Sequence, residues 1–124
     1  MGGSSYSRKK KKVEPSGHDK YVVLSSKFFR GVVPENSSWD SEKLKHPFDI
    51  KYIPLDKLYT TQNKIPTKKI NQELESHKKM TDYEPITVIK KDKKYIVTSG
   101  NERVVAMASR GYKKIKARVF DMDR

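Results

Sequence analysis

The most informative pattern of apolar and polar residues lies near the C-terminal end of the chain. Residues 94–98 alternate in aromatic and β-branched chemistry that favours a strand. Small and apolar residues then occupy positions 104–108, which suits a helix packed closely on a sheet. Gly111 follows the last helical position, where a left-handed C-cap is expected. The pattern predicts a strand over 94–98 and a helix over 101–110, joined at Gly100.

Similar patterns predict the remaining elements of the C-terminal two thirds. Strands are expected at 48–53, 86–90 and 115–120, and a helix over 68–79 with Thr67 as its N-cap. Residues 91–93 form a short link between two strands. The last strand should send Ile115, Ala117 and Val119 to one side and Lys116 and Arg118 to the other. The order β–α–β–β–α–β predicts an α+β fold, a small mixed sheet with helices mainly on one face.

The N-terminal third has a different character. Residues 1–19 are rich in Gly and Ser and contain five consecutive cations, so we expect a disordered basic arm that contacts phosphates without reading sequence. These cations are Arg8, Lys9, Lys10, Lys11 and Lys12. Residues 20–47 form an N-terminal extension with short strands at 21–24 and 27–33 and a helical turn over 39–45. Residues 48–124 form the domain itself.

Charge is the strongest compositional signal. The 124 residues include 28 basic and 15 acidic ones, a net charge of +13. Residues 1–62 carry 12 basic and 7 acidic residues, and residues 63–124 carry 16 and 8, so both halves are basic. This excess indicates a polyanionic partner, with solubility alone as the competing explanation. The chain has no cysteine, which excludes disulfides and thiol catalysis and fits a cytoplasmic location. No apolar run is long enough to cross a bilayer.

The junction at Gly100 is the candidate site. A strand–glycine–helix turn aims free N–H groups and the positive helix end at one point, where an anion can bind. Arg103 would add a guanidinium suited to a phosphate. Alternatively, this is an ordinary turn in which Arg103 forms a structural ion pair with Glu102 or another carboxylate. Spacing alone leaves both interpretations open.

The same residues carry a family resemblance. Residues 99–103 (Ser-Gly-Asn-Glu-Arg), followed by a small-residue helix ending in Gly, resemble the G-x-x-R box of the ParB/sulfiredoxin superfamily. Residues 53–58 (Ile-Pro-Leu-Asp-Lys-Leu) and 62–64 (Gln-Asn-Lys) resemble the opening of ParB N-terminal domains. Residues 84–88 (Glu-Pro-Ile-Thr-Val) resemble the strand before the box. The resemblance spans about 48–120 and implies the ParB/sulfiredoxin-like fold.

The resemblance also implies roles for individual residues. The box contacts nucleotide phosphates in this family, which assigns phosphate binding to Ser99, Gly100, Asn101, Glu102 and Arg103. Gln62 and Lys64 match positions near which the nucleotide lies, although an ordinary polar loop is the alternative. Lys68 and Lys69 would extend this anion-binding surface, unless they are simply solvated. Asn101 stands where sulfiredoxins carry their catalytic Cys, so sulfiredoxin chemistry is excluded. Glu102 replaces a residue that is usually Arg or His, which lowers the local positive charge.

We therefore expect a ParB-like nucleic-acid-associated protein of the kind found on phages and plasmids. It would hold phosphates of DNA, RNA or a nucleotide through the arm and the Gly100–Arg103 corner, with a nucleotide and Mg²⁺ as the cofactor to consider. One alternative is a nuclease or nucleotide-dependent phosphotransferase with Glu102 as general base, although no metal-ligand spacing is evident. Another is a protein-binding module that inhibits a host factor.

Overall fold

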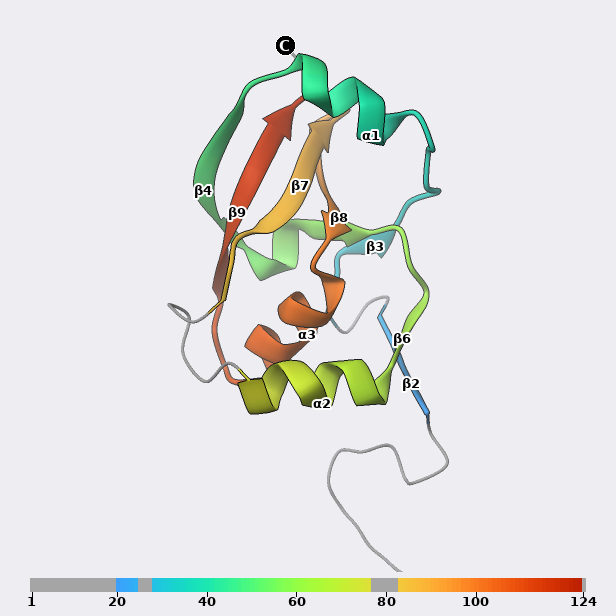
Figure 1. The fold of residues 1–124 in the computed structure, drawn as a ribbon, viewed down its shortest axis with the longest axis vertical. Helices are drawn as coiled ribbons and strands as arrows, with labels where there is room; N and C mark the ends of the chain where they lie inside the picture. Colours follow the sequence, from blue (N-terminus) through green and yellow to red (C-terminus); the bar gives the residue numbers. More distant parts are fainter. Residues whose placement is uncertain (1–19, 25–27, 77–82, 124) are drawn as a thin grey trace, which may run out of the picture.

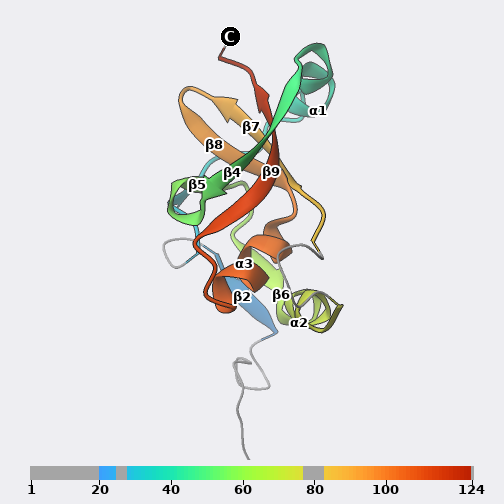
Figure 2. The ribbon, with the colours of Figure 1, turned by 90° about the vertical axis from the view of Figure 1, so that its left-hand side faces the viewer.

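The computed structural model describes residues 20–24, 28–76 and 83–123. These residues form a six-stranded sheet, a small two-stranded sheet and helices on both faces of the larger one (Figures 1 and 2). The arm cations Arg8 to Lys12 and residues 77–82 lie outside the described residues.

The six-stranded sheet is mixed. Its order is β3–β5–β8–β7–β9–β4, with β4–β9 and β7–β8 antiparallel and the other neighbours parallel. The strands are β3 (Gly31–Val32), β4 (Phe48–Pro54), β5 (Leu58–Thr60), β7 (Ile86–Lys91), β8 (Lys94–Ser99) and β9 (Lys114–Asp121). A separate antiparallel pair joins β2 (Tyr21–Val23) to β6 (Lys64–Pro66). The helices are α1 (Trp39–Glu42), α2 (Thr67–Ser76) and α3 (Asn101–Ser109), with 3-10 turns η1 (Lys43–Lys45) and η2 (Leu55–Lys57).

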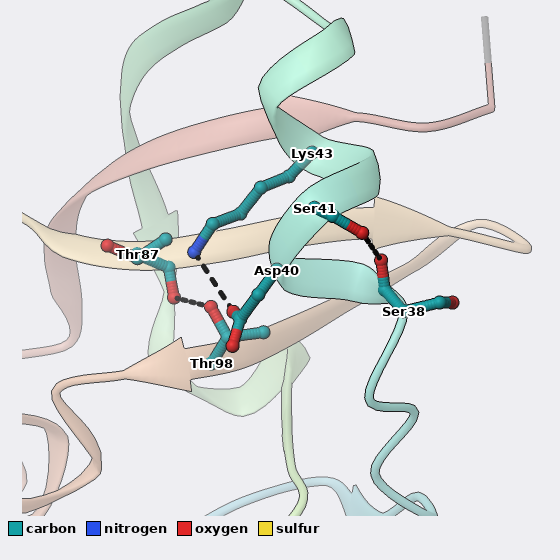
Figure 3. A network of polar contacts seen from close by, with 6 residues as sticks. All are labelled: Ser38, Asp40, Ser41, Lys43, Thr87 and Thr98. Atoms are coloured by element: carbon teal, nitrogen blue, oxygen red, sulfur yellow. Dashed lines mark hydrogen bonds and ion pairs between the residues drawn. The ribbon is translucent and has the colours of Figure 1, made fainter.

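The two faces of the larger sheet are covered unequally. On one face α2 and α3 enclose the main core, to which α3 contributes four consecutive buried residues from Val104 to Met107. The other face carries a smaller cluster of Trp39, Ile89 and Ile96. Trp39 belongs to α1, and Figure 3 shows this short helix over the strands that carry Thr87 and Thr98. The sequence prediction of an α+β fold with helices mainly on one face is thus confirmed.

Most elements begin and end close to where the sequence placed them. In β9, Ile115, Ala117 and Val119 are buried while the intervening residues are more exposed, as the alternation predicted. The strands β5 and β6 were missed, because each has only three residues and the sequence around them was interpreted as a turn and a loop. Their partners, β8 and β2, are distant in sequence, so pairing rather than local propensity forms these strands.

The C-terminal end of α3 confirms the expected glycine cap. Gly111 has φ of +88°, its N–H donates to the Ala108 carbonyl, and the Tyr112 N–H donates to Met107. These two bonds make a Schellman motif, in which a left-handed residue satisfies the last helical carbonyls. The chain can then turn directly into β9.

Residues 20–47 pack into the same body as the rest of the described chain. Leu24 and Phe29 are buried in the main core, and β3 pairs with β5 at the edge of the sheet. The division of the chain at residue 48 stays a prediction.

Candidate functional site

The corner between β8 and α3 has the strand–glycine–helix geometry that the sequence predicted. Ser99 ends β8 and is exposed, and Gly100 is the N-cap of α3 with φ of +103°. Gly100 is buried, and a Cβ built on it would lie 2.6 Å from Ile86 Cγ2. Glycine is therefore required by its backbone conformation and by packing against β7. Both requirements hold without any ligand.

Asn101, the first residue of α3, is held inside the protein. It is 4% exposed, and its Oδ1 accepts a hydrogen bond of 2.8 Å from the Thr60 hydroxyl, which is fully buried. The same hydroxyl oxygen accepts a bond of 3.1 Å from the Gln62 N–H. This chain of bonds connects the loop after β5 to the start of α3. It holds the backbone of Gln62 beside Thr60, while the Gln62 residue stays exposed, and a role for Gln62 in binding stays a prediction.

Arg103 faces two groups from neighbouring segments. Its Nε lies 3.6 Å from Oε1 of Glu73 on α2, and its Nη1 donates to the Glu84 carbonyl at 3.5 Å. The two side chains of the ion pair are 27% and 19% exposed, so the pair is partly shielded from water. An anion that used Arg103 would have to compete with the Glu73 carboxylate. The ion pair is the one foreseen in the structural alternative, with Glu73 rather than Glu102 as the acid.

The other predicted anion-binding residues are spread over a wider surface. Lys64 on β6 places its Nζ 4.4 Å from the ring centroid of Tyr21, in a cation–π contact. Lys68 and Lys69 are exposed in the first turn of α2. Glu102 is half-buried on the first turn of α3. The structure does not gather these side chains around one cavity.

A second set of cations lies on the sheet and was not singled out in the sequence as a site. The hairpin of β7 and β8 carries Lys90, Lys91, Lys93 and Lys94, and the segment from just before β9 to its middle adds Lys113, Lys114, Lys116 and Arg118. The ion pairs Arg103–Glu73 and Lys43–Asp40 use none of these eight cations. The parallel register of β7 and β9 separates them into two groups, because Lys90 is opposite Asp121 whereas Ala117 is opposite Ile86. The hairpin cations and the cations near the start of β9 therefore lie at opposite ends of these strands. Their signal in the sequence is the repeated occurrence of Lys within and beside these strands.

The turn of this hairpin is fixed by a carboxylate. Asp92 and Lys93 have φ values of 52° and 65°, the conformation of a type I′ turn, which non-glycine residues adopt at a cost. Asp123 accepts bonds from the Lys93 N–H at 3.0 Å and the Asp92 N–H at 2.7 Å. These bonds, the Lys93 bond first, hold the pKa of Asp123 below its usual value, because they stabilise the charged carboxylate.

A hollow of about 510 Å³ lies between this hairpin and the segment before α1. Its lining includes Trp39, Lys91 and Lys94, together with Glu35 and Asp92. The indole Nε1 of Trp39 is buried and has no hydrogen-bond partner, but it also has almost no accessible surface. A ligand in the hollow therefore cannot reach this donor, and the mixed charges of the wall favour no single ligand class.

The described part of the chain offers neither a metal centre nor a membrane span. Among the residues that the structure describes, no group of three or more His, Cys, Asp or Glu side chains is placed to hold a metal ion. Within the same residues, no helix is both long and apolar enough to span a bilayer.

Comparison with known proteins gives a partial structural match. No family model matches this chain, and no curated protein matches it. Among solved structures, the chain is similar to sulfiredoxin from Arabidopsis thaliana, with 25% sequence identity and a TM-score of 0.49. The similarity covers 57% of this chain and 83% of that one.

Proposed function

We propose that this protein binds nucleic acid through its phosphates, and that cations of the sheet and of the N-terminal arm supply most of the attraction. The observation that carries the proposal is the net charge of +13 together with the cations of β7, β8 and β9. Binding of this kind gains free energy from the release of counterions and does not depend on base sequence.

The placement of the sheet cations supports this assignment. Acidic residues that neutralise cations on the surface would weaken the field felt by a polyanion. At the hairpin, Asp123 attracts Lys90 and Lys91, and Asp121 is opposite Lys90 in the register, so the field there is partly neutralised. Lys113 and Lys114, at the start of β9, are exposed. Their charge is therefore directed to solvent, where phosphates can approach.

The Gly100–Arg103 corner is secondary in this proposal. Ser99, Gly100, Asn101, Glu102 and Arg103 form the expected turn, but Asn101 is bonded to Thr60 and Arg103 is paired with Glu73. A phosphate there would rely on the N–H groups of the first turn of α3 and on the positive end of the helix. The contribution of such a contact is small beside that of many lysines.

The test is a salt titration of binding to a fluorescently labelled 20-base-pair DNA duplex, followed by anisotropy between 50 and 200 mM salt, about the range over which such contacts weaken strongly. One variant replaces each of Arg8, Lys9, Lys10, Lys11 and Lys12 by Gln, which keeps the length of the arm. A second replaces Lys113, Lys114 and Lys116 by Gln. Each variant should bind more weakly. The slope of log K against the logarithm of the salt concentration should become less negative by about 0.9 for every phosphate that the variant no longer neutralises.

A matched control replaces two exposed acidic residues of the described surface, Asp56 and Glu75, by Asn and Gln. This control should bind as tightly as the unchanged protein or more tightly, since it raises the positive charge. The proposal is wrong if the unchanged protein binds neither DNA nor RNA at 50 mM salt, a concentration at which about 10 µM protein suffices to detect even sequence-independent binding.

A further inference from the structure

The outer strand β4 presents an unusual row of exposed apolar side chains. Phe48, Ile50 and Tyr52 are 43%, 49% and 56% exposed. They alternate along the strand, so they point to the same face of the sheet. Figure 1 shows β4 at the left edge of the sheet, beside β9, and Figure 2 turns this edge towards the viewer.

The residues paired with this row are cations. Ile50 is opposite Arg118 and Tyr52 is opposite Lys116 in the register of β4 and β9. Paired residues of neighbouring strands share a face, with their Cβ atoms about 5 Å apart. We call these five residues, Phe48, Ile50, Tyr52, Lys116 and Arg118, the β4–β9 strip.

The strip belongs to the lightly covered face of the sheet. The Phe48 ring lies 5.3 Å from the ring of Phe120, and Phe120 packs against the cluster of Trp39, Ile89 and Ile96. The helix α1 therefore covers one end of this face, and Lys43, the first residue of η1, places its Nζ 5.8 Å from the centroid of the Phe120 ring. Phe48, Ile50 and Tyr52 stay exposed on this face.

We propose that the β4–β9 strip is the binding surface for a single-stranded nucleic acid, whose bases stack on Phe48 and Tyr52 while Lys116 and Arg118 contact the phosphates. This inference rests on the nucleic-acid binding proposed above and names the form of nucleic acid and the site. Phe48 and Tyr52 are four positions apart on an extended strand, which places their Cα atoms about 13 Å apart, so two bases can be held at once. Ile50 gives an apolar surface between them.

Charge and chemistry select this occupant over others. Bases stack on exposed rings only when they are unpaired, which excludes an intact duplex from the same contacts. A second copy of this chain, placed face to face, would bring Lys116 and Arg118 near their equivalents in a protein of net charge +13. Phosphates, by contrast, complement these cations.

The experiment compares a labelled 20-nucleotide single strand of mixed sequence with the duplex of the same sequence, at one salt concentration. The variant Phe48→Leu/Tyr52→Leu removes both rings but keeps apolar side chains on the strand. Its affinity for the single strand should fall about tenfold for each ring, while its affinity for the duplex stays within about twofold. Circular dichroism and melting confirm that the variant is folded.

Tyr21→Leu is the matched control. Tyr21 is 49% exposed and also lies beside a lysine, but it belongs to β2, which pairs with β6 in the other sheet. This variant should retain single-strand binding. If it loses as much affinity as the strip variant, stacking on β4 is not the cause and the inference is overturned.

Other outcomes separate this inference from the proposed function. Single-strand binding that survives loss of both rings overturns the strip but leaves phosphate binding intact. Absence of binding to single strand and duplex alike overturns both. Sedimentation equilibrium supplies a further check: a dimer of the free protein that becomes a monomer in Phe48→Leu/Tyr52→Leu would assign the strip to self-association instead.

Discussion

Replacing Gly100 by Ala gives the sharpest test of how the corner between β8 and α3 is built. Gly100 has φ of +103°, and an added Cβ would lie 2.6 Å from Ile86 Cγ2 and 3.0 Å from Ile86 Cβ. Ile86 is fully buried, so it cannot swing into solvent to relieve the contact. The substitution therefore introduces both a strained backbone and an overpacked core.

The two costs can be estimated separately. A non-glycine residue in the left-handed region loses about 1–2 kcal/mol, and overpacking a core typically costs about 1–3 kcal/mol more. The sum, about 2–5 kcal/mol, is a large part of the stability of an ordinary domain, which is about 5–15 kcal/mol. The Tm should fall by at least about 8 °C, since each kcal/mol lowers the Tm of a domain of this size by about 4–8 °C.

Gly111→Ala isolates the backbone cost. Gly111 has a similar φ of +88°, but a Cβ there would meet no atom within 4 Å. Urea unfolding of both variants, followed by circular dichroism, should show that Gly100→Ala loses about 1–3 kcal/mol more than Gly111→Ala. Equal losses would refute the packing argument. They would favour the alternative that position 100 is glycine because a phosphate approaches the backbone there.

Three further predictions concern charged groups. A double-mutant cycle of Arg103→Ala and Glu73→Gln should give a coupling of about 0.5–1 kcal/mol in urea unfolding, because the pair is partly shielded from water. Arg103→Ala should keep duplex affinity within about twofold, since one cation among many supplies little of the attraction, whereas loss of binding with unchanged stability would place a phosphate at the corner. The pKa of Asp123 is lowered in the folded protein, so its bonds to the N–H groups of Lys93 and Asp92 stabilise the fold at pH values above 3.8, the ordinary pKa of an aspartate. This stabilisation is lost as the pH falls through the lower pKa of the folded state. NMR titration of the carboxyl groups should find the lowered pKa of Asp123. The free energy of unfolding of Asp123→Asn should not show this part of the pH dependence. An ordinary pKa for Asp123 would contradict the hydrogen bonds described above.

Local patterns in the sequence predicted much of the fold. Alternation of apolar and polar residues located β7, β8 and β9, and glycine after a small-residue helix located the Schellman cap at Gly111. These features depend on residues near one another in the chain, so local conformational preference and periodicity are sufficient to predict them. The strands β5 and β6 were beyond this reasoning, since their pairing with distant segments defines them.

The partners of Arg103 and Asn101 were decided by tertiary structure. The sequence placed both residues at the corner but left a phosphate and a carboxylate as equal candidates for the arginine. Packing of α2 against α3 brings Glu73 to Arg103, and the return of β5 beside β8 brings Thr60 to Asn101. Glu73 and Thr60 are both distant in sequence from the corner at residues 100–103, so no local motif could reveal these partners.

The sequence alone therefore determined which residues alternate along β4 and β9 and that the chain carries a strong positive charge. It could not determine that Phe48, Ile50 and Tyr52 would be left exposed, because an alternating apolar row usually predicts a buried face. Only the tertiary structure showed that β4 is the last strand of the sheet and that its three apolar residues lie outside the cluster around Trp39. Periodicity states which side chains share a face, whereas the packing of distant elements decides which face is covered.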